Sequence, residues 1–328
     1  MGLLPKQIEL YRKFFGFIIR YWNSDLVNSF SDKAMDLEVE TDNQFSKEGA
    51  KEFVEDLKKM GPTYIKLGQL LSTRPDLLPE VYLEELQTLQ DDVKPIPYED
   101  IHKIVEEELG VSISKAFEEF DKEPLANASI SQVHSAVLNS GQKVVVKVQR
   151  PGIRTKFLDD LDTLDNIANW AYNNSKEARK FNVIELIEEL RYTLLKELDY
   201  GLEAKNMLAL NKTLEEFDRI YVPDPVLDYS TDKILTMHFV HGRKVTKIHP
   251  LKRIEDNLDP LVDQLIKGYL KQIVVDGLAH GDPHPGNIHI TRDNKLAFMD
   301  IGMVVRFSGV IQEQILQLLI GVSSYDSE

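Results

Sequence analysis

The stretch QKVVVKVQ, residues 142–149, is the feature that most constrains the fold of this chain. Its β-branched residues predict a strand, in which the even-numbered valines share one face and Lys147 and Gln149 share the other. Another β-branched run, ISQVHSAVL at residues 130–138, precedes it, and the intervening NSG is typical of a hairpin turn. The chain must therefore build an antiparallel sheet.

Most of the remaining sequence has helical periodicity. A helical region from Ser46 to Asp92 is divided at Gly61-Pro62 and at Pro75, because proline ends or starts helices. Further helices are predicted over residues 98–109, 155–178, 182–217, 259–275 and 310–319, and further strands within 234–242 and 295–302. The order is helices, then strands with inserted helices, then helices around short strands, and we expect an α+β fold.

Composition excludes several classes of function. A formal net charge of −15 argues against nucleic-acid binding, which needs clustered Lys and Arg. The absence of cysteine excludes disulfides and thiolate zinc sites, and it favours a reducing compartment. No long apolar run predicts a transmembrane segment, and no secretory signal is evident. We expect a cytoplasmic or organellar protein that is not secreted.

The first thirty residues leave two alternatives open. They contain the aromatic and basic stretch IELYRKFFGFIIRYWNS, which is typical of a helix. Such a helix could lie on a membrane surface as a peripheral contact. The favoured alternative is that it docks on its own domain, because such apolar stripes usually belong to the core.

Histidine and aspartate are concentrated in LAHGDPHPGNIHI, residues 278–290. His280 and His284 are four residues apart, which is a zinc-binding spacing when both lie on one helix. Pro283 and Pro285 exclude that helix, so the spacing loses its geometric meaning. A transition-metal site therefore becomes the weaker interpretation.

The stronger interpretation starts from the carboxylate and amide residues. Asp282 and Asn287 are five apart, and Asp300 precedes Gly302 after a short strand. This order follows the Asp-x-x-x-x-Asn loop and the Asp-x-Gly of protein kinases. In that pattern one aspartate addresses the attacking group, while the amide and the second aspartate supply the hard oxygen ligands that Mg²⁺ prefers. Lys147 on its strand would then contact the nucleotide phosphates.

The chain resembles the UbiB/ADCK family of atypical, protein-kinase-like proteins. The resemblance covers about residues 45–325 and rests on KLGQ at 66–69, LANAS at 125–129, KELDYGLEA at 196–204 and HGDPHPGN at 280–287. It implies a bilobal protein-kinase-like α+β fold. Residues 1–95 would form an N-terminal helical extension carrying KLGQ, residues 96–240 an N-lobe with inserted helices, and residues 241–328 a short helical C-lobe.

The resemblance also implies roles for individual residues. Lys147 would bind the nucleotide with Glu203 as its helix partner, and Asp282 would be the catalytic-loop aspartate. The other implied site residues are the Mg²⁺ ligands Asn287 and Asp300, the phosphate loop Ala126, Asn127, Ala128 and Ser129, and the inter-lobe linker Met237, His238 and Phe239. The loop has alanines where typical kinases have glycines, and each Cβ limits close approach to phosphates. We therefore expect an altered nucleotide preference and weak ordinary kinase activity.

The KLGQ segment is peculiar to the family, where it covers the cleft in which a protein substrate would dock. Lys66 and Gln69 are three apart and share a helix face, and Gly68 permits close packing. Lys66 is expected to meet Glu197, the first acid of the Glu-x-Asp motif that ends at Asp199. On a single helix, Glu197 and Glu203 would be about 240° apart, so that one helix could address both Lys66 and Lys147.

Three functions remain in competition. The first is an ATP- or ADP-binding, Mg²⁺-dependent atypical kinase or ATPase, whose role in isoprenoid-quinone or lipid metabolism rests on the resemblance alone. The others are an ordinary Ser/Thr protein kinase and a nucleotide-switched, non-enzymatic scaffold at a membrane. Asn127 and His238 depart from the family pattern and leave the nucleotide contacts open. Only 26 residues follow Gly302, so we expect either a truncated chain or a short family member.

Overall fold

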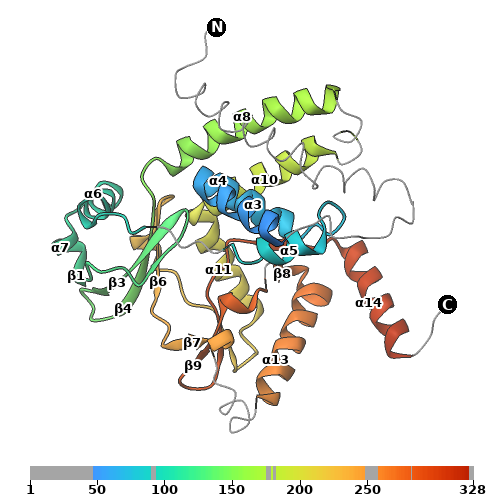
Figure 1. Ribbon diagram of the computed structural model, residues 1–328. Coiled ribbons are helices and arrows are strands. Elements are labelled where there is room, and N and C mark those ends of the chain that lie inside the picture. The colour runs from blue at the N-terminus through green and yellow to red at the C-terminus, as the bar shows by residue number, and fades with distance from the viewer. Residues whose placement is uncertain are drawn as a thin grey trace. The chain divides into compact units, whose positions relative to one another are not determined.

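The computed structural model describes residues 47–89, 94–174, 179, 182–247, 258–281 and 283–324. The predicted N-terminal helix and Asp282 therefore lie outside the described residues. The chain divides into two compact units, one of residues 1–95, 127–131 and 150–195, the other of residues 96–126, 132–149 and 196–328. Their elements are labelled in Figure 1.

The described part of the first unit is helical. Its elements are α3 (Lys47–Met60), α4 (Pro62–Ser72), α5 (Glu80–Leu86), α8 (Ile153–Asn174) and most of α10 (Val183–Glu197). The predicted division between α3 and α4 is confirmed, because Gly61 takes a φ of +112° and Pro62 starts the next helix. Gly68 provides the close approach predicted for KLGQ: a Cβ there would lie 2.4 Å from Leu89 Cδ1.

A buried polar contact joins α4 to α8 inside this unit. The hydroxyl of Thr63 donates a hydrogen bond to the Asp160 carboxylate, and both residues are almost fully buried. Burial raises the pKa of Asp160, although the bond from Thr63 and the charge of Lys156 act in the opposite direction. The residue that precedes KLGQ by three positions is thus tied to a helix about a hundred residues later.

The sheet of the second unit confirms the predicted hairpin. Strands β3 (Ser131–Leu138) and β4 (Lys143–Gln149) are neighbours, and Gly141 in the turn has a φ of +80°. The sheet continues from β4 to β6 (Ile234–His238), antiparallel and with Lys147 opposite Leu235, while β1 (Phe117–Phe120) and β2 (Ala126–Asn127) pair with β3.

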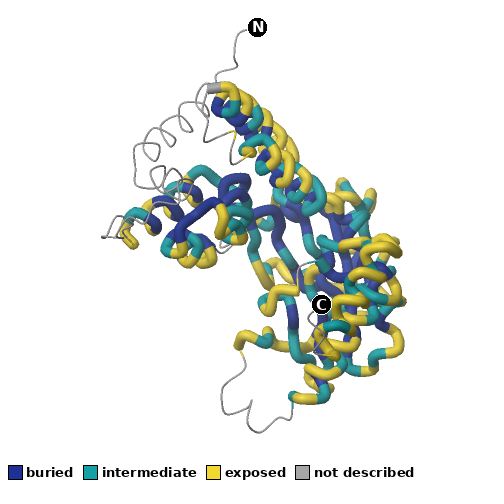
Figure 2. Tube along the Cα trace, turned by 90° about the vertical axis from the view of Figure 1, so that its right-hand side faces the viewer, coloured by how far each residue is buried: buried dark blue, intermediate teal, exposed yellow. Residues whose placement is uncertain are grey.

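The two faces of β4 enter two different cores. The even-numbered valines pack with Ile101 and Val105 of α6 (Tyr98–Leu109), a helix with the predicted bounds. Val145, on the opposite face, packs with residues of α11 (Tyr200–Thr213). Figure 2 shows the strands as largely buried and the helices as alternating between buried and exposed residues. The face that carries Lys147 is therefore the one directed at α11.

The remaining elements complete the second unit. They are α7 (Ile113–Ala116), β5 (Ile220–Tyr221), β7 (Gly242–Lys244), α13 (Asp259–Leu270), β8 (Leu278–His280), β9 (Ile288–Thr291), β10 (Leu296–Phe298), β11 (Val304–Arg306) and α14 (Gly309–Ser323), with short 3₁₀ turns at Leu227–Tyr229, Val245–Lys247 and Pro285–Asn287. A second sheet has the order β5-β10-β9-β7, and β11 pairs with β8. After α13 the helix continues as a π-helical turn over Lys271–Asp276. Within the described part of the chain, no helix combines the length and the apolar character needed to cross a membrane.

The single helix predicted over residues 182–217 is wrong. Helix α10 ends at Glu197, and α11 begins at Tyr200. The break follows from Asp199, whose carboxylate accepts a hydrogen bond from the Leu202 N–H at 2.7 Å and so caps α11. Glu197 and Glu203 consequently lie on different helices, and the argument that one helix presents both of them fails.

Candidate functional site

The centre of the candidate site is an ion pair between a strand and a helix. Lys147 Nζ on β4 lies 2.9 Å from Oε2 and 3.2 Å from Oε1 of Glu203 on α11. The two side chains are only 16% and 4% exposed. Desolvation alone would lower the pKa of Lys147, but the Glu203 carboxylate outweighs it and holds that pKa well above its ordinary value. The structure therefore presents a buried, charged lysine.

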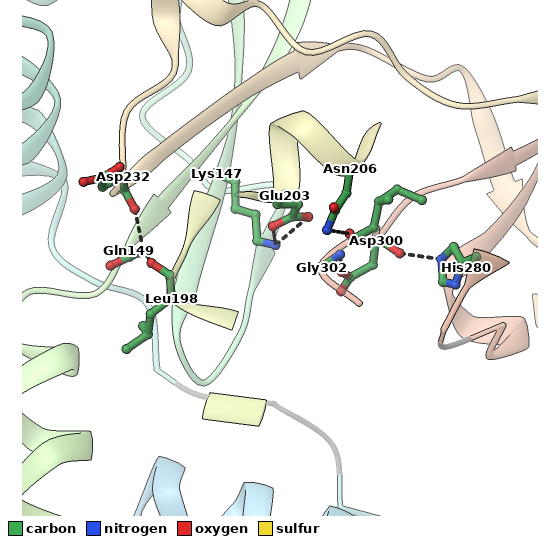
Figure 3. Close-up of polar contacts among 10 residues, drawn as sticks. Lys147, Gln149, Leu198, Glu203, Asn206, Asp232, His280, Asp300 and Gly302 are labelled. Carbon is green, nitrogen blue, oxygen red and sulfur yellow. Dashed lines mark hydrogen bonds and ion pairs between the residues drawn. The ribbon is translucent and has the colours of Figure 1, made fainter. Parts of the chain in front are cut away.

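A buried glutamine on the same strand face secures the start of α11. Gln149 Nε2 donates to the backbone carbonyls of Leu198 at 2.7 Å and Asp232 at 2.9 Å, as drawn in Figure 3. Because Leu198 lies in the break between α10 and α11, this amide positions the helix that carries Glu203. Strand alternation places Gln149 beside Lys147, but it does not predict this contact.

The predicted Asp-x-Gly turn follows β10 and is held mainly by its backbone. The Asp300 carbonyl accepts a hydrogen bond from His280 Nε2 at 2.6 Å, and the carboxylate of the exposed Asp300 accepts one from the Gly302 N–H at 3.2 Å. The next residue is held from α11, because the Ile301 carbonyl accepts a hydrogen bond from Asn206 Nδ2 at 3.3 Å. Figure 3 shows these contacts around Asp300.

The two predicted Mg²⁺ ligands lie at the same end of a β-hairpin. Strands β9 and β10 pair antiparallel with Ile288 opposite Phe298, so Asn287 and Met299 extend the pairing. The Met299 N–H donates to the Asn287 carbonyl at 2.9 Å, one residue before Asp300. An exposed carboxylate next to an amide-bearing residue offers the hard oxygen donors that suit Mg²⁺.

The histidines of the loop make structural contacts. His280 is buried at the end of β8, and the side-chain oxygen of Gln272 accepts a hydrogen bond from its N–H at 3.0 Å. His284 Nδ1 accepts from the Gly286 N–H at 3.0 Å and caps the 3₁₀ turn that ends at Asn287. Among the residues with described placements, no three His, Cys, Asp or Glu side chains converge as a metal site. Asp282 lies outside them, and its catalytic role stays a prediction.

The predicted phosphate loop begins on β2 and turns toward β3. The Ala128 N–H donates to the Ser131 carbonyl at 2.8 Å, and the Ala128 carbonyl accepts from Arg150 Nε at 2.8 Å. Asn127 Oδ1 and the hydroxyl of Ser129 are buried and have no hydrogen-bond partner in the described structure. Such unsatisfied atoms are uncommon in folded proteins. Ala126, the first predicted loop residue, is exposed.

The predicted linker residues differ in their surroundings. Met237 is buried in the core shared with α11. The His238 Nε2 accepts from Gln142 Nε2 at 2.7 Å, and the His238 Nδ1 lies 3.7 Å from an Asp224 carboxylate oxygen. Phe239 donates its N–H to the Lys143 carbonyl at 3.1 Å, and Lys143 Nζ lies 4.4 Å from the centre of its ring.

The predicted occluding residues belong to different units. Lys66 and Gln69 lie on α4 in the first unit, where Gln69 Nε2 donates to the Leu89 carbonyl at 3.3 Å. Glu197 and Asp199 belong to the second unit, where Asp199 caps α11. The contact expected between Lys66 and Glu197 therefore stays a prediction.

Two site-supporting residues were missed by the sequence analysis. Gln149 follows Lys147 by two positions on a strand, and Asn206 follows Glu203 by three positions on a helix. Both spacings place a residue beside the predicted one. A polar residue on such a face is the signal that could have found them.

A family model described as an ABC1 atypical kinase-like domain matches residues 88–328. The chain belongs to the ABC1 atypical kinase-like family. The resemblance to the UbiB/ADCK proteins is confirmed by named relatives. One is the Protein ACTIVITY OF BC1 COMPLEX KINASE 8, chloroplastic, of Arabidopsis thaliana, which is 39% identical over 85% of this chain and 37% of its own length. Another is the Probable protein kinase UbiB of Cellvibrio japonicus, 37% identical over 73% of this chain and 43% of its own length.

A solved structure supports the fold class. The Rv3197–erythromycin complex from Mycobacterium tuberculosis matches with a TM-score of 0.53 and 27% identity, covering 84% of this chain and 72% of that one. The α+β, protein-kinase-like fold predicted from the sequence is confirmed. The ABC1 family chain spans less than half the length of both curated relatives named above.

Proposed function

We propose that this chain binds Mg²⁺ with ATP or ADP and acts as an atypical kinase or ATPase. The observation that carries the proposal is the buried ion pair between Lys147 and Glu203, at 2.9 Å. Glu203 lies on α11, the helix that also holds the Asp300 turn through Asn206. A structural ion pair would not need a second connection to a turn with an exposed carboxylate. Membership in an atypical kinase-like family supports the same function.

Each residue has a distinct task in this proposal. Lys147 would contact nucleotide phosphates while Glu203 holds its ammonium in place. Asn287 and Asp300 would hold Mg²⁺, while the phosphate-loop role of Asn127 and Ser129, which belong to the first unit, rests on the resemblance. Bound Mg²⁺ supplies neutralisation of phosphate charge. Asp282 would orient the attacking hydroxyl or water, a role that rests on the resemblance.

A role in isoprenoid-quinone or lipid metabolism, with quinone precursors or a membrane surface as partners, is the finer part of the proposal and rests on the family resemblance. An organellar setting belongs to it as well, since an Arabidopsis relative is named chloroplastic. The measurement that addresses it is phosphate release from ATP with and without liposomes or quinone precursors. If liposomes or quinone precursors stimulate phosphate release and Asp300→Asn loses that stimulation, the proposed role is supported.

The primary test is thermal unfolding with ADP or ATP, with and without Mg²⁺. A ligand at about a hundred times its Kd stabilises a protein by about 2.7 kcal/mol. We expect a Mg²⁺-dependent rise in Tm that Asp300→Asn abolishes. The control is Asp263→Asn, which removes the same charge from an exposed pair with Lys267 on α13 and should behave as wild type. Absence of a Mg²⁺-dependent shift in wild type would refute the proposed function.

A further inference from the structure

Asn206 is a buried amide on a helix whose other buried residues are mostly apolar. It lies on α11 one turn after Glu203, is 8% exposed, and is followed by the buried apolar residues Met207 and Leu210. A residue that served only for packing would be apolar here, because burying an amide costs free energy unless it forms hydrogen bonds. Its Nδ2 group donates to the Ile301 carbonyl at 3.3 Å.

The backbone carbonyl of Ile301 is therefore held from α11, because Asn206 donates to it. Ile301 itself is fully buried, and His280 Nε2 donates to the preceding carbonyl of Asp300. The backbone on the C-terminal side of Asp300 is thus anchored at two successive carbonyls, while the Asp300 residue is exposed.

We propose that Asn206 is a positioning residue that keeps the Asp300 carboxylate oriented for Mg²⁺, an inference that rests on the proposed nucleotide function. Mg²⁺ demands near-ideal octahedral geometry and tolerates displaced ligands poorly. Without Asn206, the Ile301 carbonyl would be buried without its donor, which favours a rotation of the turn. Because Glu203 and Asn206 share α11, the phosphate-binding lysine and the metal-binding turn are held by the same element.

The test compares Asn206→Leu with Asn211→Leu. Asn206→Leu keeps a similar side-chain size and removes the donor, while Asn211 is a half-buried amide on the same helix whose hydrogen bond, at 2.6 Å, goes to Asp224 instead of to the Asp300 turn. In wild type, the stabilisation by ADP is titrated with Mg²⁺. Asn206→Leu should raise about tenfold the Mg²⁺ concentration that gives half of the maximal stabilisation by ADP. It should leave the stabilisation by ADP in EDTA unchanged. Asn211→Leu should titrate as wild type.

Hydrogen exchange of the ligand-free protein provides an independent readout. Asn206→Leu should speed exchange at the amides of residues 300–302, and Asn211→Leu should not. If Asn206→Leu does not fold, Asn206→Ala takes its place. Wild-type exchange and an unchanged Mg²⁺ midpoint in the variant would overturn the inference. Proportional weakening of ADP binding with and without Mg²⁺ would overturn it as well, since that indicates a merely structural role. A wild type without any Mg²⁺ response would refute the proposed function and the metal part of this inference, while exchange would still decide the positioning of the turn.

Discussion

Lys147 carries its charge in a position where an unpaired ammonium would be unfavourable. Its partner Glu203 is 4% exposed, so water contributes little to compensating either charge. Removing one member of a buried ion pair typically costs about 3–5 kcal/mol, whereas replacing both with apolar residues is often neutral. The pair is therefore expected to add little net stability compared with apolar residues of similar size.

This argument predicts a non-additive result. Glu203→Gln should lower the free energy of unfolding by about 3–5 kcal/mol, because it leaves Lys147 charged and without its counter-ion. The double variant Lys147→Met/Glu203→Leu should lose less than the single variant while losing nucleotide binding. Urea unfolding measures the first quantity and the ADP-dependent Tm the second. A double variant less stable than Glu203→Gln would contradict the prediction.

Asp160 gives stability a pH dependence of definite sign. Burial raises its pKa in the folded state above the unfolded value of about 3.9. The folded chain then binds more protons than the unfolded chain, so this contribution to stability falls as pH rises above about 4, and it levels off above the folded pKa. The charges that Asp160 experiences include Lys156 and Asp159.

Asp160→Asn should remove this dependence. The amide oxygen can still accept the hydrogen bond from the Thr63 hydroxyl, while the group no longer ionises. Relative to wild type, the variant should become more stable as pH rises from 4 to 7. Urea unfolding of both proteins across that range measures the difference, and a relative gain by wild type with pH would disprove the assigned sign.

Among the elements, helix α4 packs closely against Leu57 and Leu89 because its KLGQ motif contains Gly68. A Cβ at Gly68 would lie 2.4 Å from Leu89 Cδ1 and 2.8 Å from Leu57 Cδ1. Overpacking of this kind costs about 1–3 kcal/mol, while alanine gains up to about 1 kcal/mol in helix propensity. The steric effect should dominate.

Gly68→Ala should therefore destabilise the protein by about 1–2 kcal/mol in urea unfolding. Gly309→Ala is the matched control, because a Cβ at the start of α14 would meet nothing within 4 Å. That variant should be neutral or slightly stabilising. Equal effects at both glycines would show that close packing does not explain the residue in KLGQ.

The break between α10 and α11 shows what element-level prediction can miss. The apolar periodicity continues through residues 182–217, so a single helix was predicted there. Aspartate is a preferred N-cap residue, so Asp199 indicates that a helix can start at the next residue. The prediction of a single helix used Asp199 only as the second acid of the Glu-x-Asp motif. By contrast, the two faces of β4 were predicted correctly, because strand alternation is a local property.

At the scale of the whole molecule, long-range contacts limit prediction from sequence. The bond between Thr63 and Asp160 joins residues 97 positions apart, and no local pattern specifies it. The chain passes from one unit to the other after residues 95, 126, 131, 149 and 195. Hydrophobic periodicity does not reveal these crossings. The kinase-like order of Lys147, Asn287 and Asp300 was predictable, since it depends on motif chemistry and spacing.

Net charge is a property of the whole chain and has its own consequence. With 54 acidic and 39 Lys or Arg residues, the chain repels itself when compact. The screening length falls from about 30 Å at 0.01 M salt to about 8 Å at 0.15 M, so added salt weakens this repulsion. Exposed ion pairs such as Lys267–Asp263 weaken too, but each contributes at most about 1 kcal/mol.

We therefore expect stability to rise with salt over this range. Raising NaCl from about 0.01 to 0.15 M should increase the free energy of unfolding by about 1 kcal/mol, or Tm by about 1–2 °C. The buried Lys147–Glu203 pair is largely shielded from salt, so Glu203→Gln should show nearly the same salt slope as wild type. A fall in Tm with NaCl would mean that favourable ion pairs outweigh the repulsion of the 15 excess negative charges.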